Sequence, residues 1–465
     1  MDDRETSNNV DHGGAPATPS RGQLLGRILK SFGSRLGQTG TPADVHRVIA
    51  QCRQLVHERG EVSGARLASQ VLDAYKALDP KGADAFFGLL ATEFAPDADD
   101  IRRAADAFSG DPSAANLQRL QAVVEPPRQE LFRCLNTAPG GTAALVQLRK
   151  QLLDRLDQHP EWAPIDIDLK HLFRSWFNRG FLTLQQIDWR TSAVILERLI
   201  QYEAVHQIQG WHDLRRRLQS DRRCYAFFSP ALPDDPLIFI EVALTRGVPS
   251  RVQPLLDPDA PVTNPERCTC AAFYSITNCQ EGLRGISFGN FLIKQVAADL
   301  GSALPWLRTQ ATISPIPGFV KWLKHSALPA GTSLSSEMQA YLERVSANEA
   351  TAPPPASLQV EVRRLCAYYL LRAKRGRAPL DSVARFHLAN GARLERLNWH
   401  GDTSPKGLSN SLGLSVNYRY RLGDVERNHE AFANDYEVVA SRELQMLANS
   451  FRDGSAASAG QRRQR

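Results

Sequence analysis

Three segments of this sequence hold residue types that could carry chemistry, each in a context that would fix their position. The first runs from Glu281 to Asn290 and places three glycines between a predicted strand and a predicted helix. Glycine lets backbone N–H groups approach a ligand closely, and a helix N-terminus favours an anion. The segment is therefore a candidate pyrophosphate loop, although it matches neither common nucleotide-binding glycine motif. A glycine-containing loop without a ligand fits the pattern equally well.

The second segment places Ser314 at the end of a short predicted strand, Gln310–Ser314, directly before Pro315 and Pro317. Proline fixes φ and has no backbone N–H to donate, so it ends a strand abruptly. A hydroxyl at the rigid end of a strand is well placed to bind a substrate. Taken alone, the pattern is more often an ordinary Ser-Pro turn.

The third segment contains His387 within a short apolar run, Ala384–Leu388, which we expect to form a strand that stops at the turn signal Asn390-Gly391. Histidine can donate or accept a proton near neutral pH. The chain has eleven histidines, and most histidines are structural, so spacing alone does not select this one.

The elements that must position these residues change in type along the chain. Residues 1–40 and 454–465 are poor in apolar residues and are expected to be a disordered arm and tail. From 41 to 188, apolar residues recur every three or four positions, which predicts a helical bundle. From 189 to 453, short apolar runs typical of strands are mixed with helices, including one from Asn290. The sequence therefore predicts an α+β protein, with an all-α bundle before a mixed-sheet domain.

The composition excludes several classes of protein. Of the 465 residues 42% are hydrophobic and the net charge is +6, while the arginines of Leu214–Arg217 are expected to line a solvated helix face. Seven cysteines without a CxxC pair argue against a zinc site or a disulfide framework and favour a reducing compartment. No apolar run approaches the ~20 residues that span a bilayer. We therefore expect a cytoplasmic protein with no membrane or nucleic-acid partner.

Together, the three segments resemble the malonyl-CoA decarboxylase family. The likeness is close from about Trp189 to Tyr420 and weaker in the helical half, and it is carried by Phe288–Lys294, Ser314–Phe319, Phe386–Ala392 and Asn417–Tyr420. Several long motifs in the right order make a chance match improbable. The family implies an N-terminal helical domain and a C-terminal catalytic domain with a GNAT-like α/β fold and a mixed sheet.

The resemblance also implies a reaction and a site. It implies that malonyl-CoA is converted to acetyl-CoA and CO2 with Ser314 and His387 as the catalytic pair, and that Asn417 and Tyr418 shape the pocket. No metal or organic cofactor is expected, because the thioester itself accepts the electron pair. The family tends to form tetramers, which implies a homo-oligomer. The CoA-binding residues implied are Arg284, Gly285, Ile286, Ser287, Phe288, Gly289 and Asn290, with Ser287 where some relatives have Glu.

Two other functions share some of these features. A GNAT-type acyltransferase would use the glycine loop and helix but would need an amine acceptor and no Ser314–His387 pair. An acyl-CoA sensor would bind without turnover. The sequence does not decide which of Ser314 and His387 gives the proton to carbon.

Overall fold

The computed structural model describes residues 42–450, except for 59, 287–291, 326–327, 329–331, 348 and 350–351. The expected arm (1–40) and tail (454–465) lie outside the described residues. The chain divides after Gly141 into two compact units, Met1–Gly141 and Thr142–Arg465. The boundary expected near residue 189 between a helical and a catalytic domain stays a prediction.

The first unit is helical throughout its described part, as the three- and four-residue spacing predicted. Helices α4, α5 and α6 begin at side chains that accept from free backbone N–H groups, those of Asp79, Asp97 and Ser113 respectively. Buried aromatic rings such as Phe86 and Phe87 fill its core. The helices are α2 (Pro42–His57), α3 (Glu61–Lys76), α4 (Pro80–Glu93), α5 (Ala98–Gly110), α6 (Ala114–Val124) and α7 (Pro127–Asn136).

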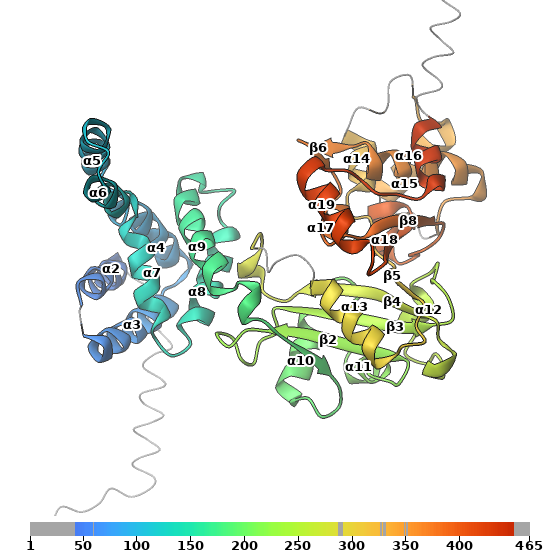
Figure 1. The fold of residues 1–465 in the computed structure, drawn as a ribbon, viewed down its shortest axis with the longest axis horizontal. Coiled ribbons are helices and arrows are strands. Elements are labelled where there is room, and N and C mark those ends of the chain that lie inside the picture. Colours follow the sequence, from blue (N-terminus) through green and yellow to red (C-terminus); the bar gives the residue numbers. More distant parts are fainter. Residues whose placement is uncertain are drawn as a thin grey trace, which may run out of the picture. The chain divides into compact units, whose positions relative to one another are not determined.

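The second unit combines helices with a mixed sheet, which confirms the predicted α+β class (Figure 1). The strands are β1 (Thr183–Ile187), β2 (Arg222–Phe228), β3 (Ile238–Thr245), β4 (Cys270–Asn278), β5 (Thr309–Thr312), β6 (Lys374–Arg375), β7 (Ala378–Pro379), β8 (Arg393–Asn398) and β9 (Ser415–Tyr420). The helices are α8 (Gly141–Leu153), α9 (Ala163–Trp176), α10 (Ala193–Tyr202), α11 (Trp211–Arg217), α12 (Gln253–Leu256), α13 (Leu292–Ala303), α14 (Phe319–His325), α15 (Ser336–Ser346), α16 (Gln359–Leu371), α17 (Ser382–Ala389), α18 (Pro405–Ser411) and α19 (Val425–Asp435).

The large sheet has the order β1-β2-β3-β4-β5-β9-β8, and only β4 and β5 run parallel. Their pairing covers Cys270–Phe273 of β4. Just beyond it, Tyr274 forms a bulge against β3, because Phe273 lies opposite Val242 while Ser275 lies opposite Glu241. Bulges often lie beside active sites because they end regular pairing. Beyond β5 the pairing with β4 stops, while the pairing with β9 continues to Ser314.

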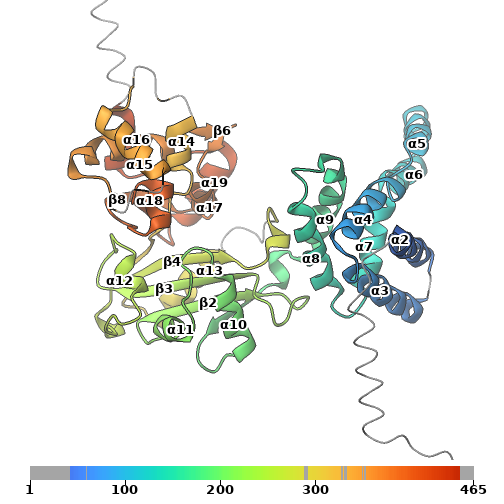
Figure 2. The ribbon, with the colours of Figure 1, turned by 180° about the vertical axis from the view of Figure 1, so that it is seen from behind.

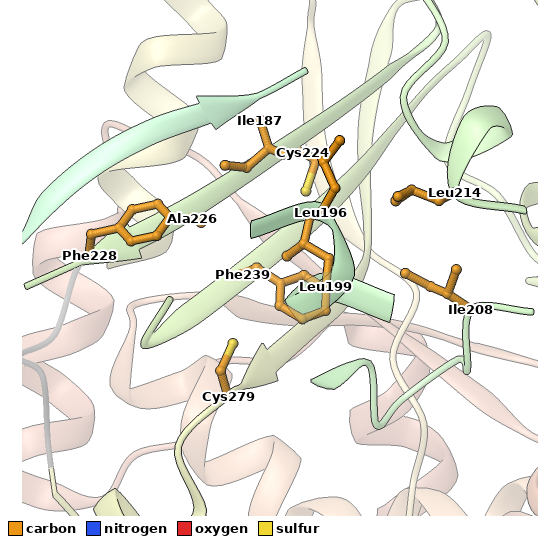
Figure 3. Packing of buried hydrophobic residues seen from close by; sticks show 10 residues of the cluster. All are labelled: Ile187, Leu196, Leu199, Ile208, Leu214, Cys224, Ala226, Phe228, Phe239 and Cys279. Atoms are coloured by element: carbon orange, nitrogen blue, oxygen red, sulfur yellow. The ribbon is translucent and has the colours of Figure 1, made fainter. Parts of the chain in front are cut away.

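Apolar side chains cover one face of the sheet and join it to α10. Figure 3 shows Leu196 and Leu199 of α10 beside Cys224, Ala226 and Phe228, which alternate along β2 and so share a face. Helix α13 covers the opposite face (Figures 1 and 2). The intervening residue Tyr225 confirms this, since its hydroxyl bonds Asp299 of α13 at 2.8 Å. Within the part of the chain that the structure describes, no helix is long and apolar enough to cross a bilayer.

Two expectations from the sequence were wrong. Residues 384–388 are not a strand but part of α17, which Asp381 caps by accepting from the backbone N–H of Ala384 at 2.8 Å. The arginine run does not form a solvated face either, because Arg216 and Arg217 are buried. Arg216 pairs with Asp221, and Arg217 pairs with acidic residues of α11 and β3. Such partners offset the free-energy cost of burying the arginine charge.

Candidate active site

Ser314 lies two residues beyond β5, where the chain still pairs with β9 but no longer with β4. Its backbone N–H donates to the carbonyl oxygen of Val416 at 2.9 Å, and its own carbonyl accepts from Val416 at 3.0 Å. The segment Pro315-Ile316-Pro317 then ends regular pairing, as predicted from its two prolines. Ser314 is thus held at a rigid strand end with its side chain buried.

His387 comes to Ser314 from the last turn of α17, 73 residues away in sequence. Its Nε2 lies 3.1 Å from Oγ of Ser314. Its Nδ1 lies 2.8 Å from the hydroxyl of Tyr420 on β9. The ring also stacks on Tyr418, with centroids 4.4 Å apart. Residues two apart on a strand share a face, so both tyrosines of β9 reach the same imidazole.

Thr312 adds a further hydrogen-bonding group to this cluster. Oγ of Ser314 lies 2.8 Å from the hydroxyl of Thr312, which also accepts the backbone N–H of Tyr418 at 3.1 Å. Thr312 is fully buried and Ser314 and His387 nearly so. Burial lowers the pKa of His387 from 6.5 to about 3, because a low-dielectric surrounding disfavours the charged ring. The histidine is therefore a neutral imidazole at physiological pH.

Asn417 and Tyr418, the two expected pocket residues, lie on β9 next to this cluster. The Asn417 amide donates to the carbonyl oxygens of Thr312 at 2.6 Å and Pro249 at 3.2 Å, and its oxygen accepts from Asn398 at 3.0 Å. Asn417 thus ties β9 to β5 and β8. The buried hydroxyl of Tyr418 has no hydrogen-bond partner among the described residues.

Of the expected CoA-binding residues, the structure describes Arg284, Gly285 and Ile286, while Ser287, Phe288, Gly289 and Asn290 lie outside the described residues. Arg284 and Gly285 are exposed, and Gly285 has a φ of 79° that favours glycine. A buried side chain fixes this turn from beneath. Arg149 of α8 donates to the backbone carbonyl oxygens of Gly282 at 2.5 Å and Arg284 at 2.9 Å.

Gly282 shows how closely α8 approaches the same turn. A Cβ at this position would lie 1.9 Å from the carbonyl oxygen of Val146, so only glycine fits. Arg149 is itself held by Asp166 of α9, at 2.8 Å from Nε. The turn that leads into the glycine segment is therefore set by α8 and α9, two helices for which the sequence predicted no functional residue.

Comparison with known families decides what this arrangement belongs to. A family model described as the malonyl-CoA decarboxylase C-terminal domain matches residues 180–458, and one described as the N-terminal domain matches residues 94–177. The chain belongs to the malonyl-CoA decarboxylase family. The first of these matches alone covers more than half of the chain and includes Ser314, His387 and Tyr420.

Individual members of the malonyl-CoA decarboxylase family agree with this assignment. The mitochondrial malonyl-CoA decarboxylase of Anser anser anser is 35% identical over 364 residues, which are 72% of each chain. The Rattus norvegicus protein of the same name is 34% identical over 72% of this chain and 74% of its own. The crystal structure of malonyl-CoA decarboxylase from Rhodopseudomonas palustris is 48% identical, with a TM-score of 0.81 over 86% of this chain and 99% of that one.

Sequence reasoning within the malonyl-CoA decarboxylase motifs missed three residues that the structure brings to the site or to its support: Thr312, Tyr420 and Arg149. The sequence does contain a signal for Thr312 and Tyr420. Thr312 precedes Ser314 by two positions and Tyr420 follows Tyr418 by two, so each shares a strand face with a residue already singled out. Arg149 carries no such signal, because its contacts are 133 and 135 residues away.

Proposed function

We propose that the Ser314–His387 pair is where this carboxy-lyase converts malonyl-CoA to acetyl-CoA and CO2. The observation that carries the proposal is the 3.1 Å contact between Oγ of Ser314 and Nε2 of a neutral, buried His387. Such a pair can donate hydrogen bonds and a proton without holding a permanent charge. That suits a reaction whose intermediate is an enolate.

The chemistry explains why donors are needed. When the bond to the carboxylate breaks, its electron pair moves into the thioester and leaves an enolate. A fixed donor at the thioester oxygen is typically worth about 3 kcal/mol, and a positioned acid contributes roughly 10²–10⁴-fold. In this proposal Ser314 faces the reacting group, and His387 supports it from behind.

We propose that the substrate reaches Ser314 beside the point where β4 and β5 stop pairing. The two strands pair only as far as Phe273, and Tyr274 is bulged there, so backbone groups of β4 beyond this point are free of β5. The turn from Arg284 to Ile286 would lead into the pyrophosphate-binding loop. Tyr418 would shape the pocket through its stack on His387, and Asn417 would hold β5 against β9.

Two wider proposals accompany this function. The family resemblance supports a homo-oligomer, with a tetramer favoured. All seven cysteines are free, which supports the reducing cytoplasm as the compartment. Nucleic acid is not proposed as a partner, because Arg216 and Arg217 of the arginine run are committed to buried ion pairs.

The test is to mix the purified protein with malonyl-CoA and follow acetyl-CoA by mass-resolved chromatography, with His387→Ala and Ser314→Ala alongside. We expect acetyl-CoA from the wild type and a loss of at least about 10²-fold in kcat for each variant, with malonyl-CoA still bound. Near-normal turnover by His387→Ala would refute the site. Acyl transfer to an added amine, without CO2 release, would instead indicate an acyltransferase.

A further inference from the structure

Four side chains form an unbroken hydrogen-bonded chain through the site. The Tyr420 hydroxyl lies 2.8 Å from Nδ1 of His387, whose Nε2 lies 3.1 Å from Oγ of Ser314. Oγ of Ser314 in turn lies 2.8 Å from the hydroxyl of Thr312. All four residues are buried. The mechanism proposed above uses only the middle two.

The number of protons limits the directions in which these four side chains can donate to one another. Each of the four neutral groups carries one proton that it can donate, but only three hydrogen bonds join them. One terminal proton therefore finds no acceptor in the chain, either that of Tyr420 or that of Thr312. Among the described residues, the Tyr420 hydroxyl has no hydrogen-bond partner besides His387.

The Tyr420 end is the one that must donate. A phenol is a stronger donor and a weaker acceptor than an aliphatic hydroxyl. The Ser314 hydroxyl donates to the Thr312 oxygen, which also accepts the backbone N–H of Tyr418. The order is then Tyr420 O–H to Nδ1, Nε2–H to Ser314, and Ser314 O–H to Thr312. This order places the histidine proton on Nε2, the nitrogen that faces Ser314.

We propose that Tyr420 is the terminal proton donor of a relay that runs through His387 and Ser314 to the enolate carbon. The relay rests on the decarboxylation proposed above and supplies its last step. It also assigns Ser314 a role opposite to that of a serine nucleophile. His387 offers a proton to Ser314 and does not remove one, so no acyl-enzyme forms.

The step balances in atoms and charge. As CO2 leaves, the electron pair of the broken bond remains in the thioester enolate. The Ser314 O–H turns from Thr312 to the enolate carbon and gives up its proton, and Ser314 takes one from Nε2, while Nδ1 takes the proton of Tyr420. The negative charge of the substrate carboxylate ends on the phenolate of Tyr420. After acetyl-CoA leaves, water returns a proton at Ser314 and the transfers reverse.

Among the four hydrogen-bonded side chains, Tyr420 is the group that can best supply the proton. His387 is neutral, and a neutral imidazole or an aliphatic alcohol is a far weaker acid than a phenol. Burial raises the pKa of Tyr420 well above 10. The same burial opposes an anion at His387, Ser314 or Thr312, so Tyr420 remains the strongest acid of the four. The phenol thus stays protonated at rest and yields its proton only to a much stronger base, the enolate.

The experiment compares Tyr420→Phe with the wild type in single-turnover decarboxylation of malonyl-CoA, in water and in mixtures of H2O and D2O. We expect the rate to fall at least about 10²-fold, with binding of malonyl-CoA little changed. The wild-type rate should curve with the D2O fraction because several protons move together, and the variant should lose this curvature. A control is Tyr225→Phe, which removes another buried phenol hydrogen bond of 2.8 Å, to Asp299, and should retain the rate.

The possible outcomes distinguish a failure of the proton relay from a failure of the proposed decarboxylase site. If Tyr420→Phe keeps a rate within about threefold while His387→Ala is inactive, the relay is wrong and the decarboxylase site stands. If the rate falls but the dependence on D2O is unchanged, Tyr420 only positions His387. Should the Phe variant fail to fold, 3,5-difluorotyrosine at position 420 keeps the hydroxyl with a more acidic proton. An unchanged rate with this residue would also refute the relay, and a changed rate would support it.

Discussion

The hydroxyl of Tyr369 occupies the space that a Cβ at Gly318 would need. A Cβ built there would lie 2.2 Å from this oxygen. The same hydroxyl lies 3.3 Å from the carboxylate of Asp381, which caps α17. The Tyr369 phenol therefore lies between the segment that follows Ser314 and the start of α17, the helix that carries His387.

We expect Gly318→Ala to damage the site through this contact. Overpacking at a buried position typically destabilises by about 1–3 kcal/mol, and here it would push apart the segments that hold Ser314 and His387. Turnover should fall, and chemical denaturation should show the lower stability. The double variant Gly318→Ala/Tyr369→Phe should recover much of both, because without the hydroxyl the nearest ring carbon lies at 3.4 Å.

The control for this change is Gly423→Ala. No atom lies within 4 Å of a Cβ at that glycine, so stability and turnover should be unaffected. A double variant no better than Gly318→Ala alone would show that the Tyr369 hydroxyl is not the source of the damage.

The buried neutral His387 should make the protein less stable in acid. Its pKa is about 3 when folded and about 6.5 when unfolded, so between these values the unfolded chain binds the extra proton. The burial of this ring therefore does not lower the free energy of unfolding above pH 6.5. As the pH falls from 6.5 toward 3, the free energy of unfolding decreases by up to about 1.4 kcal/mol per pH unit. His206, with a pKa lowered to about 4, acts in the same direction.

Urea denaturation of the wild type and of His387→Gln from pH 7 to pH 4 measures this effect. The variant has no group to titrate at this position, so its stability should decline less steeply. Equal slopes would contradict the burial of a neutral ring. Because His387 stays neutral throughout this range, the turnover of the folded enzyme should show no acid limb near pH 6.5.

Arg149 should control CoA binding from a distance. Replacing it with Met removes the hydrogen bonds to the carbonyl oxygens of Gly282 and Arg284, so the turn into the glycine segment loses its support. We expect KM for malonyl-CoA to rise at least about tenfold with kcat changed less than about threefold, as for a loss of uniform binding.

Arg128→Met is the matched control. Arg128 is also buried and also donates to backbone carbonyl oxygens, those of Leu90 and Ala91, but it lies in the first unit. It should lower the stability without changing KM. If Arg149→Met lowers kcat and leaves KM unchanged, Arg149 does not act through the glycine segment.

Much of this protein could be predicted from its sequence because the signals are local. Prolines after Ser314 mark a strand end, apolar spacing marks the helices of the first unit, and Asp79 and Ser113 sit where helices begin. Apolar runs mark β2, β3 and β4 for the same reason. The motifs around Ser314 and His387 pointed to the family that the comparisons established.

The tertiary structure decided what depends on distant contacts. The short apolar run around His387 fits a helix or a strand equally well, and its burial in the fold, with Asp381 as cap, selects the helix. The partnership of Tyr420 with His387 joins residues 33 positions apart, and that of Arg149 with the turn spans 135. Burial by the whole fold is also what keeps His387 neutral, because desolvation is a property of the packed structure and not of any local motif.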